Sequence, residues 1–324
     1  MKHLRTFQSI GMISLLLWPF LLSAQKFEFA MIGDMPYQEA DVVKFENLIE
    51  ALNGDRRVKW VMHTGDIKTG DTPCTDEYFQ NRFDLYQKIK KPFIITPGDN
   101  EWTDCHRNGA GKYDPLERLG ALRALFFKDS HHSLGQHPMP LESQKDLAGF
   151  ENYPENQRWE KHGVWFATCH VVGSQNGMAP FAGRTGAHDQ EVADRTQAAI
   201  YWLKETFDKA KDDKGVLIMI HANPHLEQAA DSVATKGFYA FLTALEEAVI
   251  RFGKPVLFVH GDSHYFRYDK PLLDRKTKRR IENFTRLEVF GASDVHWVKV
   301  VVNPKDPNVF QVRQELVRAN FERH

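Results

Sequence analysis

Hydrophobic residues along the chain fall into short runs that alternate with longer amphipathic stretches. Apolar runs rich in β-branched and aromatic residues, bounded by Gly or Pro, predict buried strands. Such runs stand at residues 27–32, 58–62, 92–96, 164–169, 216–220, 256–259, 284–290 and 295–302. Apolar residues at helical spacing predict helices at residues 39–52, 75–90, 115–127, 189–210 and 237–252. Because strands and helices alternate through most of the chain, we expect an α/β fold.

Two parts of the chain depart from this alternation. No helix is predicted between the strands at 284–290 and 295–302, which suggests a second sheet packed on the first. Residues 130–159 and 173–188 fit neither pattern. Long irregular loops in a compact domain are often functional, so we expect both segments to border the binding pocket.

The first 24 residues have the character of a signal peptide. Lys2 and Arg5 precede an apolar stretch at residues 10–22, and the small residues Ser23 and Ala24 follow it. The stretch is too short for a comfortable membrane span, although an uncleaved anchor is the alternative. We therefore expect a secreted or periplasmic protein with no membrane span after cleavage. Residues 25–324 contain no linker or repeat, which predicts a single domain.

The charge balance gives no signal for nucleic-acid binding, because the formal net charge is only -1. The three cysteines fit an oxidising compartment. Cys74 and Cys105 lie in loops that follow two predicted strands, and we expect a disulfide between them that braces the site. Metal ligation by this pair is the alternative. Cys169 ends an apolar run and is predicted to be a buried free thiol.

Several predicted strands end in carboxylates, carboxamides or histidines. The blocks are Gly33-Asp34, Gly65-Asp66, Gly98-Asp99-Asn100-Glu101, His221 and Gly261-Asp262-Ser263-His264. The carboxyl ends of parallel strands meet at one rim of a sheet, so these side chains can converge. Carboxylates and imidazoles bind zinc, iron and manganese. Two such ions about 3.5–4 Å apart clamp an in-line phosphoryl displacement and make hydroxide available from bound water near neutral pH.

The order of these blocks resembles the motif series of the calcineurin-like metallophosphoesterases, over about residues 27–297. The resemblance implies a four-layer αββα sandwich of two mixed β-sheets flanked by helices, with a dinuclear site at the strand ends. It implies that Asp34, Asp66 and His264 hold the first ion. The second would be held by Asp66, Asp99, His221 and Asp262.

The sequence departs from the family pattern at several positions. The family's His two places after the first Asp is Pro36, and Tyr37 could replace it as a ligand. Asp99 stands at the family's Asn ligand, Asn100 at its catalytic His, and Asp262 at the first His of the last motif. The oxygen-rich set shifts the expected pair of divalent ions from Zn or Fe toward Mn, Mg or Ca.

The substitution at Asn100 raises the question of which group protonates the leaving group. Asn can donate a hydrogen bond but supplies no proton near neutral pH. His63 and His170 each end an apolar strand at the predicted rim and are our candidates, with a structural role as the alternative for both. Glu101 could orient a ligand from the second coordination sphere.

These observations favour an exported metal-dependent phosphoesterase that hydrolyses phosphomonoesters or phosphodiesters with a metal-bound hydroxide. Its substrate would be a small-molecule or polymer phosphoester. The alternative is a catalytically inactive metal-binding protein that recognises a phosphorylated or glycan ligand at the cell surface, because His is absent at positions 36, 100 and 262. A third possibility is that the motif residues only cap strand ends and bind no metal.

Overall fold

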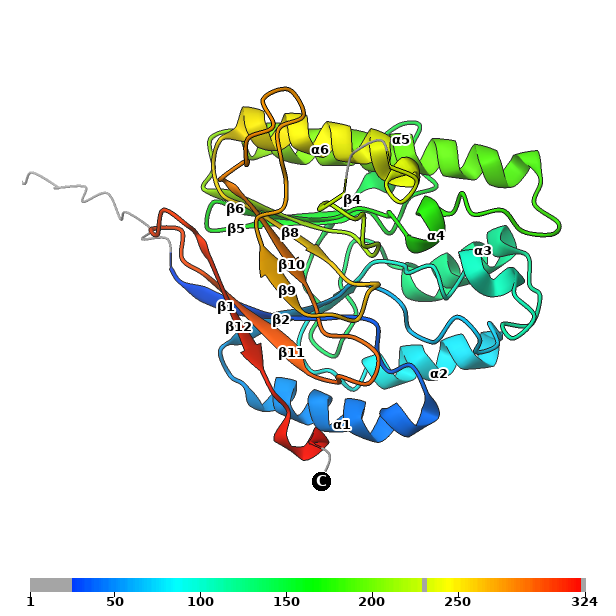
Figure 1. Ribbon diagram of the computed structural model, residues 1–324. Coiled ribbons are helices and arrows are strands. Elements are labelled where there is room, and N and C mark those ends of the chain that lie inside the picture. Colours follow the sequence, from blue (N-terminus) through cyan, green and yellow to red (C-terminus); the bar gives the residue numbers. More distant parts are fainter. Residues whose placement is uncertain (1–24, 229–231, 322–324) are drawn as a thin grey trace, which may run out of the picture.

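Two mixed β-sheets lie face to face between layers of helices (Figure 1). The structure is a computed structural model that describes residues 25–228 and 232–321. The predicted signal peptide, residues 1–24, lies outside these ranges. The four layers confirm the αββα sandwich expected from the sequence.

The smaller sheet carries the first three predicted strands side by side. β1 (Phe27–Ile32), β2 (Val58–His63) and β3 (Phe93–Ile95) are parallel neighbours. β11 (Trp297–Val302) pairs antiparallel with β1, and β12 (Phe310–Glu315) pairs antiparallel with β11. The strand order is therefore β12-β11-β1-β2-β3, and β1, β2 and β3 all end at the same rim.

The larger sheet has the order β4-β5-β6-β7-β8-β10-β9. Its central strands β6, β7, β8 and β10 are parallel, and antiparallel strands complete both edges. The bounds are β4 (Glu142–Ser143), β5 (Gln157–Lys161), β6 (Val164–Thr168), β7 (Gly215–Met219), β8 (Val256–His260), β9 (Arg267–Asp269) and β10 (Phe284–Glu288).

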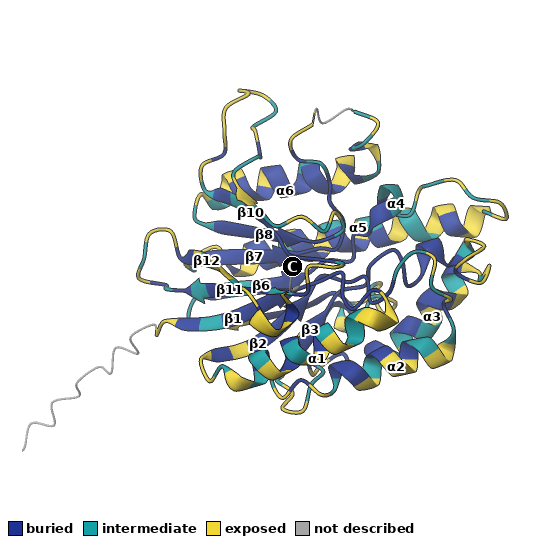
Figure 2. Cartoon of the chain, turned by 60° about the horizontal axis from the view of Figure 1, so that its bottom comes forward, coloured by how far each residue is buried: buried dark blue, intermediate teal, exposed yellow. Residues whose placement is uncertain are grey.

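Helices cover the outer face of each sheet (Figure 1). α1 (Glu39–Gly54) and α2 (Asp76–Tyr86) flank the smaller sheet, and α5 (Gly186–Lys209) and α6 (Tyr239–Phe252) flank the larger one. The remaining helices are α3 (Pro115–Phe126), the short α4 (Gly173–Asn176) and the 3-10 turns Thr103–His106, Gln144–Asp146, Lys236–Phe238 and Arg318–Asn320. Each long helix turns a buried stripe inward and an exposed stripe outward, as Figure 2 shows.

Aromatic side chains from both sheets fill the space between them. Phe29 and Trp60 of the smaller sheet meet Phe166 of the larger sheet, with the Trp60 and Phe166 ring centroids 5.2 Å apart. All three side chains are buried. Burial of apolar side chains is the main force that holds the two sheets together. Because this core lies between the sheets, the residues at the strand ends can form a site.

The second sheet that the C-terminal strands suggested is present, and these strands are divided between the two sheets. β10 joins the larger sheet beside β8, whereas β11 joins the smaller sheet beside β1. Periodicity identifies a strand but not its partner. β12, whose side chains are mostly exposed or half-buried, was not predicted.

Candidate metal centre

The polar residues that follow the strands converge from both sheets. Asp34, Asp66 and Asp99 come after β1, β2 and β3, and His221, Asp262 and His264 come after β7 and β8. Two groups have ligand atoms that all lie within 4.8 Å of one another: Asp34, Asp66 and His264, and Asp66, Asp99 and His221. Asp66 belongs to both groups and therefore lies between two candidate ion positions.

The backbone at these strand ends is unusual. Asp34, Asp66, Asp262 and His264 have φ values of 53°, 58°, 78° and 59°, in the left-handed region. Non-glycine residues in this region are uncommon and cluster at functional sites. A Cβ placed on Gly98 would lie 2.3 Å from the amide nitrogen of Asp66, so only glycine lets these two turns pack together.

The first group contains a buried carboxylate oxygen without a protein partner. Oδ1 of Asp34 accepts a hydrogen bond of 3.0 Å from the Asp262 amide and lies 3.8 Å from Nε2 of His264. Oδ2 of Asp34 is buried and has no hydrogen-bond partner among the described residues. A buried charged oxygen without a partner is costly. An ion at this position would satisfy it, so the residues fit a metal.

The second group is organised around His221. Its Nε2 lies 2.9 Å from Oδ1 of Asp99, 3.4 Å from Oδ1 of Asp66 and 4.0 Å from Oδ1 of Asp262. On the other side of the ring, Nδ1 lies 2.9 Å from the carbonyl oxygen of Thr64. A carbonyl can only accept, so Nδ1 carries the hydrogen and Nε2 is left as the ligand atom, as is usual for metal-binding histidines.

The pKa shifts of the ligand residues also indicate a cation site. Burial raises the pKa of Asp34 and Asp66 well above the ordinary value. Although burial opposes it, the surrounding carboxylates raise the pKa of His221 well above the ordinary range. Without an ion, the centre therefore holds protons that the ions would displace.

This proton competition predicts that metal affinity increases with pH. Burial raises the pKa of Asp34 and Asp66, and the neighbouring carboxylates raise that of His221, so an ion competes with protons for this group of ligands. The dissociation constant for Mn²⁺ should fall by about tenfold per pH unit for each proton released on binding. Calorimetric titrations at acidic and alkaline pH, in buffers of different ionisation enthalpy, measure both quantities. A pH-independent affinity without proton release would contradict this prediction.

Asn100 lies inside the centre, but its amide hydrogens are directed at the protein. Nδ2 donates to Oδ2 of Asp66 and lies 3.1 Å both from the hydroxyl of Tyr37 and from the carbonyl oxygen of Lys68. The main-chain N–H of Asn100 also donates to Oδ1 of Asp66, at 3.1 Å. In this arrangement Asn100 orients the shared carboxylate.

The other two predicted catalytic residues are not brought to the centre. His63 is fully buried; its Nδ1 accepts from the Gly65 amide, and its Nε2 lies 3.0 Å from the Met35 carbonyl oxygen. His170 is also fully buried, with Nδ1 2.7 Å from Oε1 of Glu155. Burial lowers the pKa of both rings to about 4. Both positions favour structural roles.

Glu101 supports the turns that carry the ligands. Its carboxylate accepts hydrogen bonds from the main-chain N–H groups of Asp66, Ile67 and Gly98, at 3.2, 3.4 and 2.5 Å. The side chain is fully buried. It thus ties the turn after β2 to the turn after β3 and acts on the ligands through the backbone.

Glu101→Ala is therefore expected to lower the free energy of unfolding by about 3 kcal/mol, because several buried N–H groups lose their acceptor. Urea unfolding of the variant measures this loss. Glu247→Ala, on the exposed face of α6, is the matched control and should change stability little. Equal losses in the two variants would show that Glu101 does not hold the turns.

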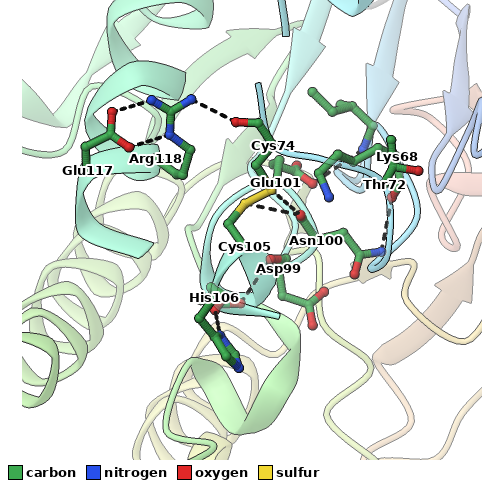
Figure 3. The surroundings of a disulfide bond; sticks show 12 residues. Lys68, Thr72, Cys74, Asp99, Asn100, Glu101, Cys105, His106, Glu117 and Arg118 are labelled. Atoms are coloured by element: carbon green, nitrogen blue, oxygen red, sulfur yellow. Dashed lines mark hydrogen bonds and ion pairs between the residues drawn. A yellow bond between two sulfur atoms is a disulfide. The ribbon is translucent and has the colours of Figure 1, made fainter. Parts of the chain in front are cut away.

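A disulfide lies beside the turn of Asp99 and Asn100, as Figure 3 shows. It joins Cys74, in the loop after β2, to Cys105, in the 3-10 turn after β3. The two sulfur atoms lie 3.6 and 3.7 Å from the main-chain carbonyl oxygen of Asn100. The predicted pairing is confirmed, and Cys169 is the buried free thiol that the sequence indicated.

Of the two irregular segments that were expected to border the binding pocket, only one contacts the candidate metal centre. Ser174 in the segment 173–188 donates to Oδ2 of Asp99 at 3.1 Å, so this segment borders the centre as expected. Residues 130–159 instead supply β4 and part of β5 at the edge of the larger sheet, because their chain pairs with β6. Asn223 was not predicted; its main-chain N–H donates to Oδ2 of Asp262 at 3.0 Å.

A pocket of about 160 Å³ begins at His225, whose main-chain N–H donates to the side chain of Asn223. The main-chain N–H of Asn223 in turn donates to Asp262, so hydrogen bonds link the edge of this pocket to a candidate metal ligand. The lining of the pocket mixes apolar residues with both charge signs: Leu226, Leu242, Leu272 and Leu273 stand beside the acidic Glu227, Glu246 and Asp274 and the basic Arg275 and Lys278.

The sequence model of the calcineurin-like phosphoesterases matches residues 27–266, most of the chain. The chain belongs to the calcineurin-like phosphoesterase family. This membership accounts for the motif order and for the two groups that share Asp66. No curated protein matches the sequence.

Three solved structures resemble this chain to different extents. PhoD superimposes with a TM-score of 0.56 at 10% identity, over 90% of this chain and 69% of PhoD. GAP50, described as the anchor in the inner membrane complex of Plasmodium, gives 0.47 at 13% identity, over 90% of this chain and 89% of its own. The 5'-nucleotidase from Candida albicans gives 0.43 at 11% identity, over 89% and 50%. At 10% identity the likeness to PhoD concerns the fold alone.

Within residues 25–228 and 232–321, no helix combines the length and the apolar content needed to cross a membrane.

Proposed function

We propose that this chain is an exported, metal-dependent phosphoesterase whose site holds two divalent ions. The observation that carries the proposal is the position of Asp66, whose carboxylate belongs to two separate groups of potential ligands. If these residues only capped strand ends, one carboxylate per strand would be enough, and no buried His would be needed beside Asp66. Export rests on the character of the first 24 residues and on the disulfide. The extent of the mature domain, residues 25–324, is part of the proposal.

Each residue has a defined part in this proposal. Asp34, Asp66 and His264 hold the first ion, and Asp66, Asp99, His221 and Asp262 hold the second. When bound, the pair supplies a hydroxide near neutral pH and neutralises charge on the phosphoryl oxygens. Asn100 and Glu101 keep Asp66 in place through the hydrogen bonds described above. Mn²⁺, Mg²⁺ and Ca²⁺ suit the oxygen-rich set, while the two histidines also admit Zn²⁺ and iron.

The arrangement favours esters whose leaving group needs little protonation. Asn100 directs its amide hydrogens at Asp66 and its neighbours, and the rings of His63 and His170 are fully buried. We therefore propose that phosphodiesters and activated monoesters are preferred over alkyl monoesters. The pocket at His225 would receive the organic part of a small-molecule or polymer substrate.

A hydrolysis assay after metal removal and reconstitution tests this function. Protein stripped by a chelator is supplied with Mn²⁺, Mg²⁺, Zn²⁺ or Ca²⁺ and given an aryl phosphodiester, an aryl phosphomonoester and an alkyl phosphomonoester. We expect turnover only when metal is present. The aryl diester and the aryl monoester should be hydrolysed faster than the alkyl monoester. Activity that survives complete chelation would contradict the proposal.

The same assay addresses a second candidate, a catalytically inactive protein that binds metal and recognises a phosphorylated or glycan ligand. The inward orientation of Asn100 favours this candidate, because it leaves the family's catalytic position without a free donor. Stoichiometric metal binding without turnover of any ester would support it.

A further inference from the structure

Between β9 and β10 the chain forms a projecting hairpin that concentrates positive charge. Every residue from Arg275 to Arg280 except Thr277 is Lys or Arg, although the formal net charge of the whole chain is only -1. Residues 276–280 are all exposed. Figures 1 and 2 show this segment projecting beyond α6. We call residues 272–281 the basic hairpin.

The base of the basic hairpin is held firmly against the larger sheet and its helices. The main-chain N–H of Ile281 donates to the carbonyl oxygen of Leu272 at 3.0 Å, and both side chains are buried. Nε of Arg275 lies 2.8 Å from Oε2 of Glu246 on α6, and the main-chain N–H of Arg275 donates to the same carboxylate at 2.9 Å. Because the base is fixed, the tip loses little freedom when it binds a partner.

The charges at the tip are not neutralised by the acidic residues of the neighbouring pocket, because those residues have other partners. Glu246 pairs with Arg275, as described above, and Glu227 lies 2.8 Å from Arg286. Oδ1 of Asp274 accepts from the main-chain N–H groups of residues 276 and 277, at 2.7 and 3.0 Å. Within the described part of the chain, four cations of the tip are therefore in no ion pair: Lys276, Lys278, Arg279 and Arg280.

Two exposed apolar side chains stand at the foot of the basic hairpin. Leu273 and Tyr239 are 47% and 48% exposed, and both line the pocket that begins at His225. A membrane surface with anionic lipids offers negative headgroups to the cations and an apolar boundary to side chains of this kind. A soluble polyanion offers charge alone, and the balanced charge of the rest of the chain provides no long basic track for it to follow.

We propose that the basic hairpin, together with Leu273 and Tyr239 at its foot, docks the protein on a membrane surface that contains anionic lipids. The attachment is reversible and weakens as the salt concentration rises, because each cation contributes only a modest, screened attraction. None of these residues is a candidate metal ligand. The inference therefore goes beyond the proposed function, and it holds or fails whether or not the centre hydrolyses an ester.

Vesicle sedimentation tests this docking. The purified protein is mixed with vesicles of phosphatidylcholine alone, or of an equal mixture of phosphatidylcholine and phosphatidylglycerol. We expect salt-sensitive binding to the mixed vesicles that exceeds binding to the neutral ones. The triple variant Lys276→Gln, Lys278→Gln, Arg279→Gln should bind the mixed vesicles about 100-fold more weakly, since each cation near such a surface contributes a factor of about five. Any contribution of the apolar residues 10–22 is common to the wild type and the variant.

The matched control is the triple variant Arg56→Gln, Lys59→Gln, Lys90→Gln, which removes the same charge from exposed residues that follow α1 and α2. It should bind the mixed vesicles as the wild type does. Leu273→Gln should weaken vesicle binding severalfold and leave any binding to heparin unchanged. All substituted side chains are exposed, so the variants should fold, and circular dichroism checks this.

Three results would overturn the inference: no preference of the wild type for the mixed vesicles, equal weakening by the two triple variants, or unchanged vesicle binding by Leu273→Gln. Binding to heparin without binding to the mixed vesicles would also overturn it, in favour of a soluble polyanion as the partner.

Discussion

Asp66→Asn is expected to abolish binding of both ions and to slow phosphoester hydrolysis by at least about 10³-fold, a loss of roughly 4 kcal/mol of transition-state stabilisation. The reason is that Asp66 is the residue common to both ligand groups. A carboxylate can give one oxygen to each of two ions, whereas the amide of Asn is neutral and has a single carbonyl oxygen. The variant keeps the size of the side chain, so the effect isolates charge and ligation.

Metal analysis and steady-state kinetics of the two proteins measure this effect. Asp212→Asn is the matched control, because Asp212 is exposed, lies in the turn after α5 and should keep wild-type metal content and activity. An Asp66→Asn protein that still binds two ions per chain would show that Asp66 is not their shared ligand.

The second large effect concerns the disulfide. The bond between Cys74 and Cys105 closes a loop with a sequence separation of 31. Replacing both residues by Ala is expected to lower the free energy of unfolding by about 3–4 kcal/mol, mainly because the unfolded chain gains freedom. Metal affinity should fall as well, since the bond lies beside the turn that carries Asp99 and Asn100.

Urea unfolding with and without a reducing agent measures this contribution. The reducing agent should shift the unfolding midpoint of the wild type to that of the double variant and leave the double variant itself unchanged. Identical midpoints for oxidised and reduced wild type would contradict the expected stabilisation.

Much of the centre could be predicted from the sequence because its residues follow buried strands. Asp34, Asp66 and Asp99 each come directly after a parallel strand, and such strands end at the same rim. Their meeting therefore follows from the alternation of strands and helices. The order of the motifs then placed His221 and His264 in the same centre, and the structure brings their ring nitrogens to it.

Side-chain direction could not be predicted in the same way. His63 and His170 also stand at strand ends, but their rings point to the Met35 carbonyl and to Glu155. A strand position fixes the rim that a residue reaches, not the partner that its side chain finds. Ser174 lies in the four-residue α4 and Asn223 in a loop, and neither segment is long enough for a period in the sequence to indicate direction. The same limit applies to Asn100, whose orientation depends on three acceptors distant in sequence.

The most direct test of the two-ion centre is a crystal structure of the Mn²⁺-loaded protein with anomalous diffraction data. Our account predicts two anomalous peaks about 3.5–4 Å apart, one on each side of the Asp66 carboxylate. One peak should lie beside Asp34 and His264, and the other beside Asp99 and His221. No peak between the two sheets, or ions bound only at sites that do not include Asp66, would contradict it.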